Sequence, residues 1–149
     1  ATQSVNVGAG NAKVTLTTKV GNDDIRELSV GHANAPTRIT NVAPGVNGTD
    51  AVNVEQLKGV AYNLSNRIDD VQDDANAGVS SAMAMAALPQ AYLPGKSMLT
   101  GGIASYNGEG AVAVGFSKLS DNGRWVLKMS GTADTQGNVG GAVGAGFHF

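Results

Sequence analysis

The sequence contains no cysteine, which excludes a disulfide framework, a thiol nucleophile and a cysteine metal site. Aromatic residues make up only 5% of the chain while glycine occurs 21 times, which argues against a conventional core of large side chains. No run of 18 or more apolar residues is present, so the sequence contains no transmembrane helix. The net charge of −2 lacks the clustered basic footprint of a nucleic-acid-binding protein, so we expect no nucleic-acid partner.

Catalytic motifs are also lacking. The two histidines, His32 and His148, are too few and too far apart for a metal site or a Ser–His–Asp arrangement. We therefore expect no enzymatic activity, no cofactor and no metal. The chain starts at Ala1 without the basic and apolar regions of a signal peptide, so we expect it to be the C-terminal piece of a longer secreted protein.

The last four apolar segments alternate residue by residue between a large apolar side chain and a small or polar one. This pattern, on segments of about ten residues parted by turns, is typical of a membrane-spanning β-barrel. A tilted strand needs about 9–11 residues to span the membrane, and each segment is long enough. The residues predicted to face lipid are Leu99, Ile103, Val112, Val114, Phe116, Trp125, Leu127, Met129, Val139 and Val143.

Four strands cannot close a barrel, and an open sheet edge is not tolerated in lipid. We therefore expect other copies of the chain to complete the barrel. The predicted turns are 107–108 and 135–137 on the outer side and 120–123 on the periplasmic side. Arg124 and Lys128 fall on the predicted inner face. There they either lie in a hydrated lumen or bind Ser80, Ser81 or carbonyls at a helix C-terminus, where cations are favoured.

A heptad repeat begins at Val54, after a possible N-cap at Asp50 or Asn53, and Leu88–Pro89 ends the helix it predicts. The repeat shrinks along the helix, from Leu64 and Ile68 to alanine and glycine, as a bundle threading a narrow tube requires. The predicted coiled-coil core is Val54, Leu57, Ala61, Leu64, Ile68, Val71 and Ala75.

Residues 38–43, Arg-Ile-Thr-Asn-Val-Ala, precede residues 48–54, Gly-Thr-Asp-Ala-Val-Asn-Val, and the pair Gln56–Leu57. Together with the terminal barrel pattern, this region resembles the neck, stalk and anchor of the trimeric autotransporter adhesins, the YadA-like family of Gram-negative outer membranes. The resemblance covers residues 37–149. It implies a mixed α and β membrane protein, a homotrimer whose twelve-stranded barrel takes four strands per chain and is plugged by a three-stranded coiled coil.

The same resemblance assigns roles to particular residues. Gly102 on the first barrel strand resembles the glycine that packs against the pore helix, at a small-residue stretch that contains Gly78, Ser80, Ser81 and Ala82. Phe149, with Phe147, resembles the terminal aromatic signal read by the barrel-insertion machinery. The implied partners are therefore the chain itself, outer-membrane lipid and this machinery, with a host or bacterial surface ligand bound through an upstream passenger.

These observations divide the chain into a β-rich head or stalk segment (1–36), a neck (37–53), a coiled-coil stalk and pore helix (54–88), a linker (89–95) and a barrel anchor (96–149). We expect an outer-membrane anchor and translocator that exports and displays its own adhesin, with the residues before the barrel at the cell surface. The alternatives are a soluble trimeric fibre protein, such as a phage tail fibre with a terminal β-cap, and a porin-like fragment. The outward apolar row with Trp125 and Phe149 argues against the first, because water disfavours it. The thinned heptad argues against an open pore.

Overall fold

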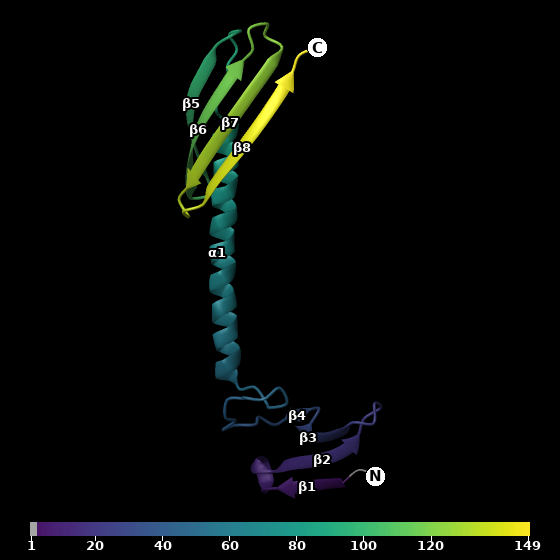
Figure 1. Ribbon diagram of the computed structural model, residues 1–149. Coiled ribbons are helices and arrows are strands. Elements are labelled where there is room, and N and C mark those ends of the chain that lie inside the picture. The colour runs from purple at the N-terminus through teal and green to yellow at the C-terminus, as the bar shows by residue number, and fades with distance from the viewer. Residues whose placement is uncertain (1–2) are drawn as a thin grey trace. The chain divides into compact units, whose positions relative to one another are not determined.

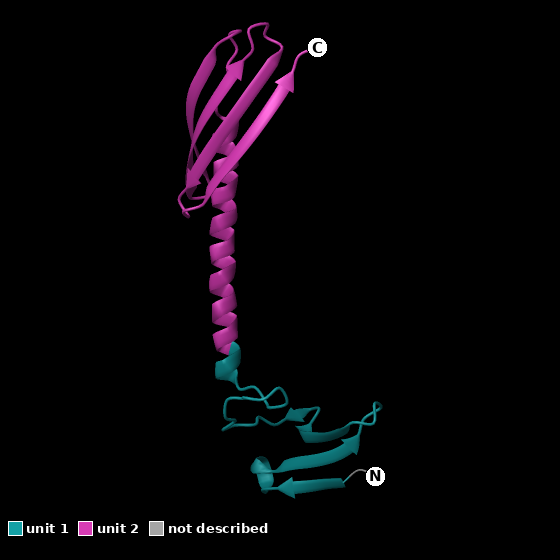
Figure 2. Ribbon diagram, in the orientation of Figure 1, with its two compact units in different colours: residues 1–57 teal, residues 58–149 magenta. Residues whose placement is uncertain are grey.

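The computed structural model describes residues 3–149, which form two compact units, residues 1–57 and 58–149 (Figure 2). Residues 1 and 2, at the start of the predicted head or stalk segment, lie outside the described residues. Each unit contains a four-stranded antiparallel sheet with its strands in sequence order.

The first sheet consists of β1 (Gln3–Val7), β2 (Val14–Val20), β3 (Arg26–His32) and β4 (Ala35–Pro36), with a 3-10 turn at Gly10–Ala12. The short strands expected in this region are present. Leu16 pairs with Val5 on one side and with Val30 on the other, so these apolar side chains share one face of the sheet. The β2–β3 turn contains Asp24 at a φ of 58°, and the Asp23 carboxylate accepts a hydrogen bond from the Ile25 amide.

The segment 37–53 has no regular secondary structure and is held together by side chains that bind its backbone. The Gln56 side chain bonds both the amide and the carbonyl of Gly45, at 2.9 and 3.0 Å. The Asp50 carboxylate accepts hydrogen bonds from the Val46 and Asn47 amides, each at 2.9 Å. These amides, that of Asn47 first and that of Val46 second, hold the pKa of Asp50 below its ordinary value because they stabilise the charged form.

Helix α1 runs from Val54 to Ala86. Asn53 is its N-cap: the Gln56 amide donates to Asn53 Oδ1, and the Asn53 amide donates back to Gln56 Oε1, a capping-box arrangement. The sequence predicted an end at residue 88, but the helix ends two residues earlier. The physical reason is Pro89, which disfavours helical geometry at the residue before it. No helix among residues 3–149 is long and apolar enough to cross a membrane.

The second sheet consists of β5 (Ser97–Tyr106), β6 (Glu109–Leu119), β7 (Trp125–Asp134) and β8 (Val139–Phe147). The C-terminal part of α1 runs along one side of it (Figure 1), which we call the inner face; the other side is the outer face. The strands of 10, 11, 10 and 9 residues are parted by turns at the predicted positions. In the β5–β6 turn both Asn107 and Gly108 have positive φ, as a tight two-residue hairpin requires. β5 and β8 are the sheet's two edges.

Candidate functional site

The outer face of the second sheet carries the large apolar side chains. Strand pairing places Leu99 opposite Phe116, Ile103 opposite Val112, and Met129 opposite Val143, so these side chains project to the same side. All ten residues predicted to face lipid are exposed in the chain. Their contact with lipid stays a prediction, and the shared apolar face is its structural basis.

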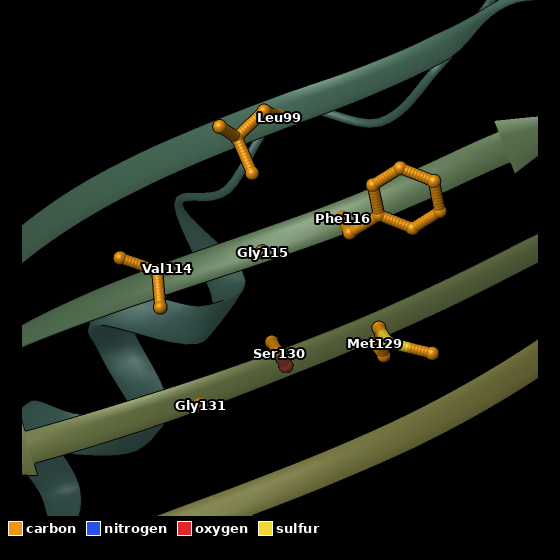
Figure 3. A pocket seen from close by; sticks show the side chains of 7 residues that line it. All are labelled: Leu99, Val114, Gly115, Phe116, Met129, Ser130 and Gly131. Carbon is orange, nitrogen blue, oxygen red and sulfur yellow. The ribbon is translucent and has the colours of Figure 1, made fainter.

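A shallow groove of about 280 Å³ crosses this outer face. Figure 3 shows Leu99, Val114, Phe116 and Met129 around it, with α1 behind the strands. Its remaining lining is Gly115, Ser130 and Gly131, so the groove holds no ionisable group. Such a surface fits hydrocarbon rather than a polar substrate, and no group of three or more His, Cys, Asp or Glu within residues 3–149 is placed to hold a metal.

The inner face is built from small residues that let the helix approach closely. Ala84 on α1 is fully buried and packs with Ala111 and Ala113 of β6. Ser80 and Ala77, one and two turns earlier on the same side of the helix, are also fully buried. Ala84 therefore meets a wall of methyl groups and backbone.

Leu88, just beyond the helix end, fills a notch formed by two glycines of neighbouring strands. A Cβ at Gly102 would lie 2.9 Å from the Ala84 carbonyl oxygen and 3.3 Å from Leu88 Cδ2. A Cβ at Gly115 would lie 2.8 Å from Leu88 Cδ1 and 2.8 Å from Thr100 Oγ1. Gly102 was the residue singled out in the sequence, whereas Gly115 and Leu88 were not. A Cβ at Gly102 would meet the helix backbone even if Leu88 rotated, and one at Gly115 would require both Leu88 and Thr100 to move.

Polar contacts fix the segment after the helix. Lys128 Nζ donates to the Leu88 carbonyl at 3.3 Å, and Ser117 Oγ, fully buried, accepts from the Ala91 amide at 2.8 Å. Of the two readings left open for the inner-face cations, the contact with a carbonyl at the helix end therefore holds for Lys128. Arg124 is exposed, and its own carbonyl accepts from the His148 amide.

At the other end of the sheet, the β7–β8 turn bonds to the helix. Ser81 Oγ donates to Asp134 Oδ2 at 3.4 Å, and Asn138 Nδ2 donates to Asp74 Oδ1 at 3.2 Å. Ser81 was among the predicted pore residues, but its partner Asp134 and the pair Asp74–Asn138 were missed. Only the register of β7 and β8 brings these residues to the helix.

The predicted pore-packing residues divide between two sides of α1. Ser80 and Ser81 lie against the chain's own sheet, whereas Gly78 and Ala82 lie on the exposed side. Nothing lies within 4 Å of a Cβ built at Gly78. Gly102 meets the helix at Ala84, two residues beyond the end of the small-residue stretch 78–82.

The predicted coiled-coil core also lies on the free side of the helix. Leu57, Leu64 and Ile68 are 64%, 55% and 65% exposed, far more than a single folded chain normally leaves uncovered. Val54, Ala61, Val71 and Ala75 are exposed as well. An apolar heptad stripe exposed over this length is the surface that coiled-coil partners cover.

The last strand ends in aromatic residues. The rings of Trp125 and Phe147 lie 4.8 Å apart at an interplanar angle of 46°, on the outer face. Phe149 is fully exposed beyond the end of β8. The role of Phe147 and Phe149 as an insertion signal stays a prediction.

Comparison with known proteins assigns this architecture to a family. Residues 89–149 match the YadA-like membrane anchor domain, and residues 38–80 match the coiled stalk of trimeric autotransporter adhesin. The chain is 47% identical over 148 residues to the autotransporter adhesin NhhA of Neisseria meningitidis serogroup B, covering 98% of this chain and 24% of that protein.

Two further relatives are adhesins of the same kind. The autotransporter adhesin EhaG of Escherichia coli O157:H7 is 41% identical over 141 residues, 87% of this chain and 9% of that protein. The trimeric autotransporter adhesin AtaA of Acinetobacter sp. (strain Tol 5) is 41% identical over 93 residues, 62% of this chain and 2% of that protein. The chain thus spans a quarter or less of each of these relatives. It belongs to the trimeric autotransporter adhesins of the YadA-like family and carries their coiled stalk and membrane anchor.

Proposed function

We propose that three copies of this chain close a twelve-stranded barrel in a Gram-negative outer membrane and that three helices fill its lumen. The observation that carries the proposal is a four-stranded sheet with an apolar outer face, a helix on its inner face and two unpaired edges, β5 and β8. Each open edge exposes a row of backbone donors and acceptors, which lipid cannot satisfy. Pairing β5 of one copy with β8 of the next removes every edge.

The free side of α1 supports the same assembly. Where the sheet covers one side of the helix, the opposite side presents Ala75, Gly78 and Ala82. These small residues allow three helices to approach one another closely inside a narrow barrel. Further from the sheet the same side of the helix carries Leu64 and Ile68, which suit an ordinary coiled coil outside the barrel.

The short linker fixes the direction of the chain. The Gly95 amide donates to the carbonyls of Leu119 and Ser120, so residues 87–96 are held at the β6–β7 turn. The helix therefore leaves the lumen at this end, which we assign to the periplasm, and leads straight into β5. The passenger passes outward through the lumen before the helices occupy it, and it stays covalently attached for display at the cell surface. Adhesion to host surfaces, other cells or matrix is then the task of the region upstream.

The experiment is a gel comparison of the detergent-extracted full chain, unboiled and boiled, with the mass checked by light scattering. We expect a heat-resistant species of three times the chain mass that requires detergent for solubility. A monomer in detergent contradicts the trimeric barrel. A trimer that is soluble without detergent contradicts the membrane anchor and favours the fibre protein instead.

Export is tested separately by placing an epitope tag before residue 3 and probing intact cells with antibody. We expect labelling of intact cells by the wild-type chain. A chain that forms the heat-resistant trimer but leaves the tag inaccessible until the cells are broken refutes export while leaving the anchor intact.

A further inference from the structure

One charged residue lies on the outer face of the second sheet. Among the outward-facing positions of β5–β8, all of which are described, Lys118 is the single ionisable side chain. It stands opposite Leu127 on β7 and Ser97 on β5. Within residues 3–149 no carboxylate forms an ion pair with it. An unpaired ammonium on an otherwise apolar membrane face requires a physical reason.

The position of Lys118 along its strand supplies part of that reason. It is the last residue but one of β6, so it lies near the end of the membrane span. A lysine on the lipid side of a barrel is costly at the bilayer midplane and nearly neutral at the interface. Its aliphatic stem can lie along apolar surface while its ammonium reaches the headgroup region. The charge thus lies where lipid phosphates are found.

Beside Lys118 the outer face is hollowed. A groove of about 230 Å³ is lined by four apolar side chains, by Lys118 and by Ser120. Trp125 and Leu127 of β7 line the groove together with the small Ala145 of β8, which pairs with Leu127. Trp125 is braced by Phe147, its neighbour at 4.8 Å. An indole at this depth presents both an apolar surface and an N–H to the interface.

A second, separate groove lies further along the same two strands, toward the middle of the proposed membrane span. The next pair along the β6–β7 seam is Phe116 opposite Met129, and these two side chains line the groove of Figure 3, which extends to Val114 and Gly131. From Lys118 to Val114 is a path of ~13 Å along the strand. One leaflet of the hydrocarbon core is roughly 15 Å thick. The distance from Lys118 to the groove of Figure 3 therefore suits a single acyl chain.

We propose that the outer surface of β6 and β7 binds a glycerophospholipid, with its anionic phosphate at Lys118 and one acyl chain along the two strands past Trp125 and Phe116. The inference rests on the proposed function, because it requires the outer face to contact lipid. The source is the periplasmic leaflet, since Lys118 lies at the end of the sheet where the linker enters β5. A single ammonium per copy matches one phosphate rather than the several phosphates of a lipopolysaccharide.

The test uses native mass spectrometry of the intact trimer, extracted in mild detergent and titrated with phosphatidylglycerol. We expect up to three bound lipids per trimer and a binding constant about tenfold or more weaker for K118Q, because a charge-assisted contact is lost. K118R retains the charge and should bind as the wild type does. K58Q removes the same charge from the helix far from the groove and is the matched control.

Two further measurements separate the headgroup from the acyl chain. A145L fills the groove while leaving Lys118 in place, so it should also weaken binding. Diacylglycerol, which lacks the phosphate, should bind the wild type no better than phosphatidylglycerol binds K118Q. Equal phosphatidylglycerol binding by the wild type, K118Q and A145L overturns the proposal, as does preferential binding of lipopolysaccharide. If K118Q yields no trimer, the proposal is tested by comparing lipid binding of A145L with that of the wild type. A normal heat-resistant trimer without lipid selectivity refutes this inference and leaves the proposed function standing.

Discussion

Replacing Gly102 by alanine perturbs the closest contact between the helix and the sheet. The added Cβ would lie 2.9 Å from the carbonyl oxygen of Ala84 and 3.3 Å from Leu88 Cδ2. Leu88 can rotate, but the Ala84 carbonyl belongs to the helix backbone and cannot move alone. The helix must therefore shift away from β5.

The magnitude follows from two opposing effects. Overpacking a close contact costs about 1–3 kcal/mol, and a clash with backbone belongs in the upper half of this range. Removing a glycine from the unfolded chain returns roughly 0.4–1 kcal/mol. The net loss is about 1–2.6 kcal/mol per copy, or roughly 3–8 kcal/mol for a trimer if its three distant sites add.

The assay is the temperature at which the unboiled trimer dissociates on a gel, measured for the purified chain in detergent. Gly101→Ala is the matched control, because it adds the same methyl group on the next residue. There the Cβ faces outward and meets only the Ala113 carbonyl oxygen at 3.9 Å. We expect a clear drop for G102A and none for G101A. Equal dissociation temperatures for G102A and the wild type, or an equal drop in both variants, would refute the close packing.

Three other predictions follow from the described contacts. Lys128→Met removes the bond from Nζ to the Leu88 carbonyl and should lower the stability of the trimer by about 1 kcal/mol per copy, with K128R close to the wild type in the dissociation assay. Gln56→Ala removes the side-chain bonds to Gly45 and to the Asn53 amide but keeps the bond from its own amide to Asn53 Oδ1. The local stability of residues 42–47 should therefore fall by about 1–2 kcal/mol, measured as faster hydrogen exchange, and unchanged exchange would contradict a stabilising role of these bonds. The lowered pKa of Asp50 means that protonation favours the open segment, so this stabilisation is present above about pH 4 and is lost as the pH falls through the folded-state pKa. After correction for the intrinsic pH dependence of hydrogen exchange, the protection of the same amides should fall with acid in the wild type. D50N should show low protection at every pH. Protection of the wild type that does not change with acid would contradict the role of the Asp50 carboxylate.

The strands and turns of the second sheet could be predicted because period-two alternation and turn dipeptides are local signals. Asn107–Gly108 requires positive φ at both residues, and this shows in the sequence without knowledge of the rest of the fold. The N-cap at Asn53 was one of two candidates for the same reason. What decided between them was the reciprocal bonding with Gln56.

The contacts of the site itself could not be predicted in the same way. Leu88 was interpreted only as part of a helix stop, because the notch that receives it joins Gly102 of β5 to Gly115 of β6. The bond between Asn138 and Asp74 joins residues 64 apart in the sequence, and the structure alone shows which turn meets which part of the helix. Family resemblance identified Gly102 and a contact at Ala82 or its neighbours, but it could not specify the Ala84 carbonyl.

The attachment of the linker at one end of the sheet has a mechanical consequence. In the proposed assembly, an upstream adhesin held at its far end pulls outward on α1, and the load passes through Leu88 and the linker to the first residue of β5. Since that residue lies at the end from which the strand runs outward, the force acts along β5 rather than across it. The ten pairs that join β5 to β6 then bear the load in shear, beginning with the pair nearest the linker, Ser97 with Lys118. The trimer therefore resists tension through three such strands in parallel, with the Leu88 notch as the first contact to bear the strain.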